Sequence, residues 1–403
     1  MFNLDEFVCK YVIKRNKSIF DEDINENYDK VVETLNGKTV LVIGGAGSIG
    51  ASFIREIIQF DLRELVVVDT SENALTELTR SLRSNAKLAL FVPNEYHTYP
   101  LDYSSVTFQR MFISHKGFDI VANFSAHKHV RSEKDIYSIE ALLRNNVINT
   151  KFLLELLELY PPEVFFCVST DKATNPVNIM GASKRIMEDL IFSYSDSFAV
   201  KTARFANVAF SNGSLPFGFL ERIRHHQPIS APNDVKRYFV SIKESGQICM
   251  LASALGNNRE IFFPKLSDSK MISFDRIAED LIVSMGYKID YCKTSKEALE
   301  KAALWTEEKP YPVFFSNSDT SGEKLFEEFY ADNEKTDLDR FRSLGIIVNK
   351  EIEDKKKILD LIISLNEAFE SRLCKKNDIV EIIDVYLDGF KHLETGTCLD
   401  DKM

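Results

Sequence analysis

The sequence lacks the features that mark several classes of protein. Its six cysteines form no CxxC pair and no zinc-type spacing, so we interpret them as reduced packing residues, as in a cytoplasmic protein. No run reaches the roughly 18 apolar residues of a membrane span, and the first residues, MFNLDEFVCKYVIKRNK, lack the long apolar stretch of a signal peptide. Acidic residues outnumber basic ones, and the net charge of -11 argues against a broad nucleic-acid-binding face. We therefore expect a cytoplasmic protein with no membrane span, no metal and no nucleic-acid partner.

What the sequence does contain is enough apolar material for a large core, since 44% of its 403 residues are hydrophobic. Short β-branched runs alternate with helical patterns, which is typical of a parallel sheet covered by helices on both faces. We predict strands at 38–44, 65–69, 89–92, 119–124, 164–169 and 199–204. The predicted fold class is α/β, with a doubly wound parallel sheet over 37–205, a helical lead-in at 1–36, a smaller substrate-binding portion at 206–330 that partly returns to the sheet, and a helical extension at 331–403.

A glycine-rich turn, GGAGSIG, joins the first strand to a helix predicted from Ala51 to Phe60. Gly44, Gly47 and Gly50 have the spacing of a Rossmann dinucleotide site: one permits the tight turn, one lets the backbone approach a pyrophosphate, and one lets helix and strand pack closely. The helix N-terminus then offers unpaired N–H groups to the phosphates. The alternative is a glycine turn that binds nothing.

An acidic residue, Asp69, ends the next strand, where its carboxylate can accept the ribose hydroxyls and would repel a 2′-phosphate. The sequence therefore predicts NAD, with NADP disfavoured. Asp102 is placed to contact the adenine, or is a plain loop carboxylate. We expect the cofactor to be held by Gly44, Gly47, Ser48, Ile49, Gly50, Asp69, Ser71, Asn73, Asp102, Tyr103, Ser125 and Lys184.

A second informative stretch, residues 164–185, reads VFFCVSTDKATNPVNIMGASKR. Its strand ends at Ser169–Thr170, and Asp171 and Lys172 follow. Ligands of open α/β sheets bind outside the carboxyl ends of strands, so these side chains are expected to face the site. Met180 and Lys184 stand four residues apart at the start of a helix and should share one face.

Together with other motifs, this stretch resembles the UDP-N-acetylglucosamine 4,6-dehydratases of bacterial polysaccharide and glycan biosynthesis, which are extended short-chain dehydrogenases/reductases. The usual catalytic tyrosine of that superfamily is Met180 here, so the chain is similar to a methionine-bearing subgroup, without the membrane domain that many of its members carry. The resemblance covers about residues 37–330. It rests on STDKATNPVNIMGASK (169–184), FSAHKHV (124–130), RNNV (144–147), ARFANVAFSNGS (203–214), RYF (237–239) and SGEKLFEE (321–328).

The resemblance implies a three-step reaction: NAD⁺ removes hydride from C4 of the sugar, water is lost across C5 and C6, and the hydride returns to C6. It implies Asp171 as the acid for the departing 6-hydroxyl and Lys172 as the base for the C5 proton. For Lys172 to act as a base its pKa must fall, which burial beside Lys184 would favour. Lys184 is expected on the nicotinamide ribose and Thr170 at the 4-hydroxyl. Met180 would form an apolar wall or simply pack in the core.

The Met180 substitution leaves one step open, because a thioether cannot exchange a proton and another group must deprotonate the 4-hydroxyl. The methionine-bearing relatives imply retention at C5 and sugars of the bacillosamine or legionaminic-acid type.

Several residues are expected to contact the substrate. Arg237 is the best candidate for the diphosphate, since a guanidinium binds phosphate oxygens bidentately, whereas Arg204 could be structural. Thr320 and Ser321 replace the Arg-Pro that usually precedes Gly-Glu-Lys, so the sequence leaves UDP- and GDP-N-acetylglucosamine open. The expected substrate contacts are Lys128, His129, Asn207, Gly213, Ser214, Arg237 and Glu323.

Two other functions stay open. A nucleotide-sugar C4 epimerase shares the first hydride transfer but normally uses the missing tyrosine. A catalytically silent NAD(P)-binding regulator would not need Asp171, Lys172 and Lys184. By resemblance we expect a homodimer or higher homo-oligomer, with an interface near 138–160 and 180–195. The apolar positions of the C-terminal extension either pack against the main body or form such an interface.

Overall fold

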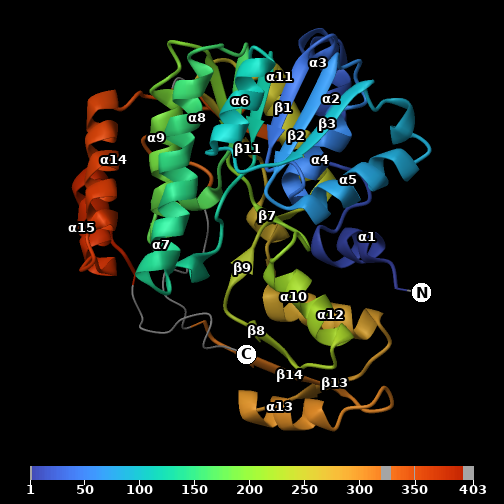
Figure 1. Cartoon of the computed structure of the whole chain (residues 1–403). Helices are drawn as coiled ribbons and strands as arrows, with labels where there is room; N and C mark the ends of the chain where they lie inside the picture. The colour runs from blue at the N-terminus through green and yellow to red at the C-terminus, as the bar shows by residue number, and fades with distance from the viewer. Residues whose placement is uncertain (1, 319–327, 349, 394–403) are drawn as a thin grey trace.

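A parallel β-sheet forms the centre of the molecule (Figure 1). The computed structural model describes residues 2–318, 328–348 and 350–393. Within them, nine strands form one sheet in the order β15-β16-β11-β6-β5-β4-β1-β2-β3. All neighbouring strands from β3 to β11 run parallel, whereas β16 and β15 are antiparallel additions at one edge. The strands are β1 (Thr39–Ile43), β2 (Glu64–Asp69), β3 (Glu95–Pro100), β4 (Ile120–Asn123), β5 (Val164–Val168), β6 (Ala199–Ala203), β11 (Glu260–Pro264), β15 (Thr336–Asp337) and β16 (Leu344–Ile347).

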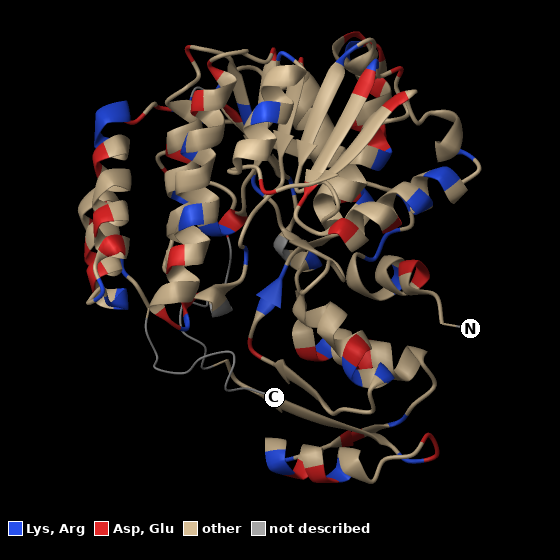
Figure 2. Ribbon diagram, viewed as in Figure 1, with Lys and Arg blue, Asp and Glu red and all other residues tan. Residues whose placement is uncertain are grey.

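Strand burial explains the sequence pattern. Every residue of β1, β5 and β11 is buried, as expected for strands covered on both faces. Charged residues lie mostly on the helices and loops (Figure 2). The predicted strand at 89–92 was wrong: Leu88–Leu90 form a 3₁₀ turn, and the third strand is β3. Because β3 is an edge strand with no fully buried residue, its sequence EYHTYP carries little of the apolar signal that the preceding LALFV shows.

Helices cover both faces of the sheet, and two apolar cores result. One face is covered by α6 (Val106–Ser114), α7 (Ile136–Leu143), α8 (Asn149–Leu157) and α9 (Ile179–Phe192). The other face is covered by α4 (Ser48–Ile57), α5 (Glu72–Ser84), α11 (Ile242–Leu255) and, from the lead-in, α3 (Tyr28–Leu35). This arrangement confirms the predicted Rossmann-type α/β fold.

A smaller part lies below the carboxyl ends of the strands and has its own apolar core (Figure 1). Its parallel three-stranded sheet has the order β13-β14-β8, and short strand pairs β10–β7 and β12–β9 connect it to the main body. The lead-in helices α1 (Leu4–Phe7) and η1 (Val8–Val12) join this core, whereas α2 (Asp21–Glu26) precedes α3. The remaining elements are β7 (Asn207–Val208), α10 (Leu215–Arg224), β8 (Ile229–Pro232), β9 (Lys236–Arg237), β10 (Phe239–Val240), β12 (Ile272–Ser273), α12 (Phe274–Ser284), β13 (Ile289–Tyr291), α13 (Ser295–Ala303) and β14 (Tyr311–Ser316).

The C-terminal extension is only partly helical. It begins with β15 and β16, which the sequence did not predict, and continues with the predicted helices α14 (Lys355–Glu370) and α15 (Lys376–Tyr386). The apolar side chains of both helices join the core on the α9 side, which confirms packing against the main body. The prediction of a subunit interface at 180–195 was wrong for α9, because all of its residues except Arg185 are already buried within the chain. Self-association by another surface stays a prediction.

Among the described residues, no helix is both long and apolar enough to cross a lipid bilayer.

A buried acid on α4 makes folding stability depend on pH. Glu56 is 9% exposed, and burial raises its pKa to about 7, only partly opposed by the charge of Lys243. Glu56 therefore ionises at a lower pH in the unfolded chain than in the folded protein. As a result, the free energy of unfolding falls as the pH rises from about 4.5 to 7. We expect Glu56→Gln to stabilise the protein at pH 8 by up to about 3 kcal/mol and to change little at pH 4, as measured by urea unfolding. Glu77→Gln, at an exposed position of α5, is the control and should change little at either pH; equal stability of Glu56→Gln and wild type at pH 8 would contradict the assignment.

Candidate active site

Of Gly44, Gly47 and Gly50, the three glycines of the predicted spacing between β1 and α4, the packing of the protein itself requires two. A Cβ at Gly44, whose φ is +69°, would lie 2.6 Å from the Ser125 backbone nitrogen, and one at Gly50 would lie 2.5 Å from the Gly44 carbonyl oxygen. At Gly47 the nearest atom to a Cβ would be 3.4 Å away, which is an ordinary contact. Packing does not explain the third glycine. It leaves open backbone beside the helix N-terminus, where Ser48 and Ile49 have no intrahelical acceptors for their N–H groups.

The carboxylate of Asp69 stands at this turn. One oxygen accepts the Ala46 N–H at 3.1 Å and the other accepts the Ser71 N–H at 3.0 Å. Asp69 therefore joins the end of β2 to the glycine turn, as the prediction of a ribose contact requires. The Ser71 hydroxyl caps α5 by accepting from Ala74, and Asn73 is exposed on the first turn of that helix.

Two further predicted cofactor residues lie on the loop after β3. The Asp102 carboxylate accepts hydrogen bonds from the backbone and hydroxyl of Ser104, so it shapes its own loop. Tyr103 is buried in the core, and its hydroxyl donates to the Asn145 carbonyl at 2.5 Å. The Tyr103 ring thus belongs to the apolar core of that face, and a cofactor contact by Tyr103 stays a prediction. Ser125 lies beside Gly44 of the glycine turn, and its hydroxyl donates to the Asn145 side chain.

The catalytic candidates at the end of β5 form one cluster. Thr170 Oγ1 donates to Asp171 Oδ1 at 2.8 Å, and Lys172 Nζ donates to the same oxygen at 3.1 Å. Asp171 is 3% exposed, and its backbone N–H is held by the Phe205 carbonyl. A hydroxyl and an ammonium group therefore share one buried carboxylate oxygen, an arrangement suited to moving protons.

Helix α9 places the other two predicted catalytic residues close to this cluster. Gly181 allows the approach, because a Cβ there would lie 2.5 Å from the Lys172 carbonyl oxygen. Lys184 Nζ donates to the Val168 carbonyl at 2.8 Å, and burial lowers the pKa of this lysine. Met180 is 2% exposed and belongs to the core cluster of that face.

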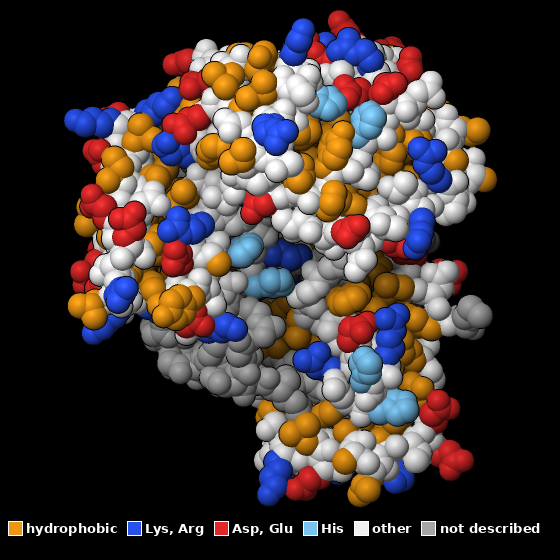
Figure 3. All heavy atoms as spheres, in the orientation of Figure 1, with side chains coloured by type: hydrophobic (Ala, Val, Ile, Leu, Met, Phe, Trp, Pro, Cys, Tyr) orange, Lys and Arg blue, Asp and Glu red, His pale blue; other side chains and the backbone are white. Residues whose placement is uncertain are grey.

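The loop after β4 and the turn before α10 meet across the carboxyl ends of the strands. Lys128 Nζ donates to the Asn212 carbonyl at 3.1 Å, and the Asn212 N–H donates to Ser48 Oγ at 2.9 Å. A Cβ on Gly213 would lie 3.0 Å from the His129 ring. Three of the predicted substrate residues, Lys128, His129 and Gly213, are thus adjacent. On the face shown in Figure 3, His, Lys and Arg side chains gather where the sheet body meets the smaller part. Burial lowers the pKa of Lys128.

The remaining predicted substrate residues differ in their surroundings. Asn207 begins β7, and its buried side-chain nitrogen has no hydrogen-bond partner within the described part of the chain. The Ser214 hydroxyl caps α10. Arg237 is 5% exposed on β9 and donates to the Lys236 carbonyl. Glu323 lies outside the described residues.

Arg204 is structural. It is fully buried, and its guanidinium donates to Glu188 at 2.7 and 2.9 Å and to Glu334 at 2.7 and 2.9 Å. It also donates to Thr174 Oγ1 and to the Phe329 carbonyl. All three guanidinium nitrogens already donate to these partners, so no N–H group is left to bind a phosphate.

Sequence reasoning missed two buried asparagines near the site, Asn146 and Asn123. Asn146, within the RNNV motif, donates to the His127 carbonyl and to Ser183 and accepts the His127 N–H, which ties the loop carrying Lys128 to α9. The motif was recognised, so its second asparagine could have been found. Asn123, at the end of β4, has a buried side-chain nitrogen without a partner among the described residues; such groups are rare in proteins unless a ligand or water satisfies them.

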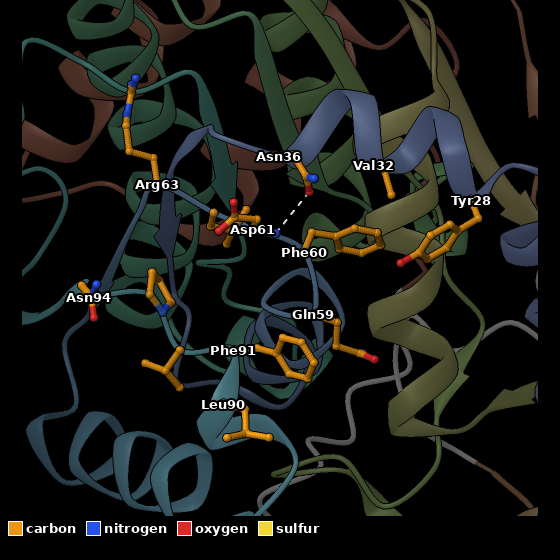
Figure 4. A pocket seen from close by; sticks show the side chains of 13 residues that line it. Tyr28, Val32, Asn36, Gln59, Phe60, Asp61, Arg63, Leu90, Phe91 and Asn94 are labelled. Atoms are coloured by element: carbon orange, nitrogen blue, oxygen red, sulfur yellow. Dashed lines mark hydrogen bonds between the residues drawn. The ribbon is translucent and has the colours of Figure 1, made fainter.

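A separate cavity of about 730 Å³ lies at the amino ends of the strands, away from the candidate active site at their carboxyl ends (Figure 4). Its lining comes from α3, from the turn before β2 and from the segment before β3, including Tyr28, Phe60, Asp61, Phe91 and Asn94. Because it faces the amino ends of the strands, it is not part of the catalytic cluster.

Comparison with known proteins gives one family. The profile described as "Polysaccharide biosynthesis protein" matches residues 40–348. The probable polysaccharide biosynthesis protein EpsC of Bacillus subtilis is 29% identical over 306 residues, 75% of this chain, which spans about half (49%) of that relative's length. The inverting UDP-N-acetylglucosamine 4,6-dehydratase of Campylobacter jejuni is 22% identical over 73% of this chain and 83% of its own. A crystal structure of the UDP-glucose 4-epimerase of Thermotoga maritima has the same fold, with a TM-score of 0.54 and 18% identity over 72% of this chain and 90% of that one.

The glycine turn makes a sharp prediction. Gly47→Ala should leave the midpoint of thermal unfolding within a few degrees of wild type but weaken NAD binding by about tenfold or more, because the methyl group would occupy ligand space. Gly50→Ala should instead destabilise the fold by about 1–3 kcal/mol, because its Cβ would collide with protein atoms. Calorimetry of unfolding and of NAD binding measures both. Unchanged NAD affinity in Gly47→Ala would remove the pyrophosphate from this turn.

Proposed function

Because the chain belongs to the polysaccharide biosynthesis protein family, we propose that it is a nucleotide-sugar 4,6-dehydratase that uses NAD. The observation that carries the proposal is the Thr170–Asp171–Lys172 cluster, with its shared carboxylate oxygen. Loss of water from a sugar needs an acid for the leaving hydroxyl and a base for the neighbouring carbon-bound proton, and this cluster offers both. The proposed substrate is UDP-N-acetylglucosamine, with GDP-N-acetylglucosamine as the alternative.

The residues present fit NAD. The open backbone at Gly47 and the free N–H groups of α4 suit a pyrophosphate. Asp69 suits an unphosphorylated ribose, which favours NAD over NADP. When bound, the cofactor would accept a hydride from C4 of the sugar and return it to C6.

The protons of the reaction balance within the cluster. Thr170 already donates to Asp171, so it can pass the proton of the 4-hydroxyl to that carboxylate and take the place of the missing tyrosine. Asp171 then gives this proton to the 6-hydroxyl, which leaves as water. Lys172, in its neutral form, takes the C5 proton. The resulting ammonium group exchanges its protons with solvent and gives one of them to C5 when the hydride reaches C6. At the end both groups have their starting charges.

The substrate would lie between the two parts of the molecule. In this proposal Lys128 and His129, from the loop after β4, and Asn207, from β7, contact the sugar, and Arg237 binds the diphosphate. The unpartnered Asn207 nitrogen supports this position, since a bound hydroxyl or carbonyl would satisfy it.

Mass spectrometry of the product tests the proposal. Purified protein, NAD and UDP-N-acetylglucosamine in ²H₂O should give a product that has lost one water and carries one solvent deuterium, at C5. A C4 epimerase would give an isobaric product without deuterium, and a silent regulator would leave the sugar unchanged. A parallel reaction with GDP-N-acetylglucosamine distinguishes the nucleotides.

Lys172→Ala should lower turnover by about a hundredfold or more, because the C5 proton loses its base. NAD affinity and the unfolding midpoint should stay near wild type, since Lys172 belongs to no apolar core. Lys151→Ala, which removes a lysine paired with Glu155 on α8, is the control and should keep full turnover. Near-normal turnover of Lys172→Ala would exclude it as the base.

A further inference from the structure

The C-terminal segment at 390–393 reaches the start of the catalytic helix, although it lies outside the 40–348 region that the family profile matches. The Leu393 N–H donates to the Val177 carbonyl at 2.9 Å, and Phe390 is buried in the core on the α9 side. Val177 belongs to the loop that leads from the catalytic cluster into α9. A part of the chain outside the matched region therefore contacts the active-site scaffold; Figure 1 shows α14 and α15 beside α9 and α7.

The central residue of this contact is Glu133. It is 7% exposed, and its Oε1 accepts the Met180 N–H at 3.0 Å. That N–H is in the first turn of α9 and has no intrahelical acceptor, and a carboxylate there also interacts favourably with the helix dipole. The Asn178 side chain accepts the next N–H, that of Gly181, at 2.6 Å.

Glu133 stands between two groups of site residues. Along the chain it ends the 3₁₀ turn Val130–Glu133, which follows Lys128 and His129 directly. Through space it holds the start of α9, which carries Met180 and Lys184. The distance between the substrate loop and the catalytic helix thus depends on where this one carboxylate sits.

His392 fixes the other oxygen of that carboxylate. Its Nε2 lies 2.9 Å from Glu133 Oε2, and both side chains are buried, with 8% and 7% exposure. A buried carboxylate oxygen without a partner is unfavourable, so the histidine favours the rotamer in which Glu133 faces Met180. The contact spans 259 positions of sequence.

We propose that Glu133 and His392 are positioning residues of the active site, and that the C-terminal segment completes the site by holding Glu133 against α9. The effect on turnover rests on the proposed function, but the effect on α9 does not. Neither residue touches the reacting atoms. They act by keeping Lys184 and the Lys128 loop at a fixed separation, and misplacement by about 1 Å can cost up to a hundredfold in rate.

Three variants and a matched control test the proposal in the 403-residue chain. His392→Ala removes the support and Glu133→Ala removes the cap, whereas Glu133→Gln keeps an oxygen for the Met180 N–H. Lys355→Ala is the control, because Lys355 lies on the same C-terminal helices but contacts the Tyr194 ring and Glu158, away from this contact. The measurements are amide hydrogen exchange of fragments covering 178–187, the unfolding midpoint, NAD affinity, and kcat and KM for UDP-N-acetylglucosamine.

We expect faster exchange at 178–187 in His392→Ala and Glu133→Ala, with kcat lowered about tenfold or more and KM changed less than kcat. Glu133→Gln should recover most of the kcat, and Lys355→Ala should match wild type in both measurements. Exchange and kcat in His392→Ala equal to those of Lys355→Ala would overturn the proposal, as would a loss of stability with unchanged kcat. If wild type dehydrates no nucleotide sugar, the proposed function fails, while hydrogen exchange still decides whether Glu133 and His392 hold α9.

Discussion

The buried guanidinium of Arg204 is the constraint on which the catalytic geometry depends. It lies just beyond β6 and binds Glu188 of α9, Thr174 of the catalytic loop and Glu334 of the C-terminal extension. Glu188 also accepts the Ser169 hydroxyl at 2.6 Å, so the residue before the catalytic threonine is held by the same cluster. Burial alone would raise the pKa of Glu334, but the hydrogen bonds and charge of Arg204 lower it to about 2. Removing Arg204 would leave two buried carboxylates, Glu188 and Glu334, without the guanidinium that pairs them, which is strongly unfavourable.

The fold was largely predictable because its signals are local. Buried parallel strands read as short β-branched runs, and the positions of the glycine turn after β1 and of Asp69 at the end of β2 follow from that pattern. The errors have one cause: exposed or late strands carry little apolar signal. The edge strand β3 reads as polar, and β15 and β16 are too short to stand out from a charged extension, although β16 and its partner β11 are fully buried.

The site was predictable where its residues are neighbours in sequence. Thr170, Asp171 and Lys172 are consecutive, and Met180 and Lys184 are one helical turn apart. The supports were not predictable, because the partners of Arg204 and Glu133 come from distant segments and nothing local identifies Glu334 or His392. Arg204 illustrates the difference, since the sequence left open whether it is structural, while its burial and its two carboxylate partners show that it is.

The late position of Glu334 and of helices α14 and α15 has a consequence for how the protein is made. Domains generally form as they leave the ribosome, N-terminal parts first. Until residues beyond 330 have emerged, Arg204 has Glu188 but lacks its second counterion, and α9 presents to water the apolar side chains that α14 later covers. Exposed apolar surface of this kind is what chaperones and proteases act on. Synthesis of α14 and α15 would therefore end a period of vulnerability, and the nascent chain would hold α9 rigidly only after both helices have emerged.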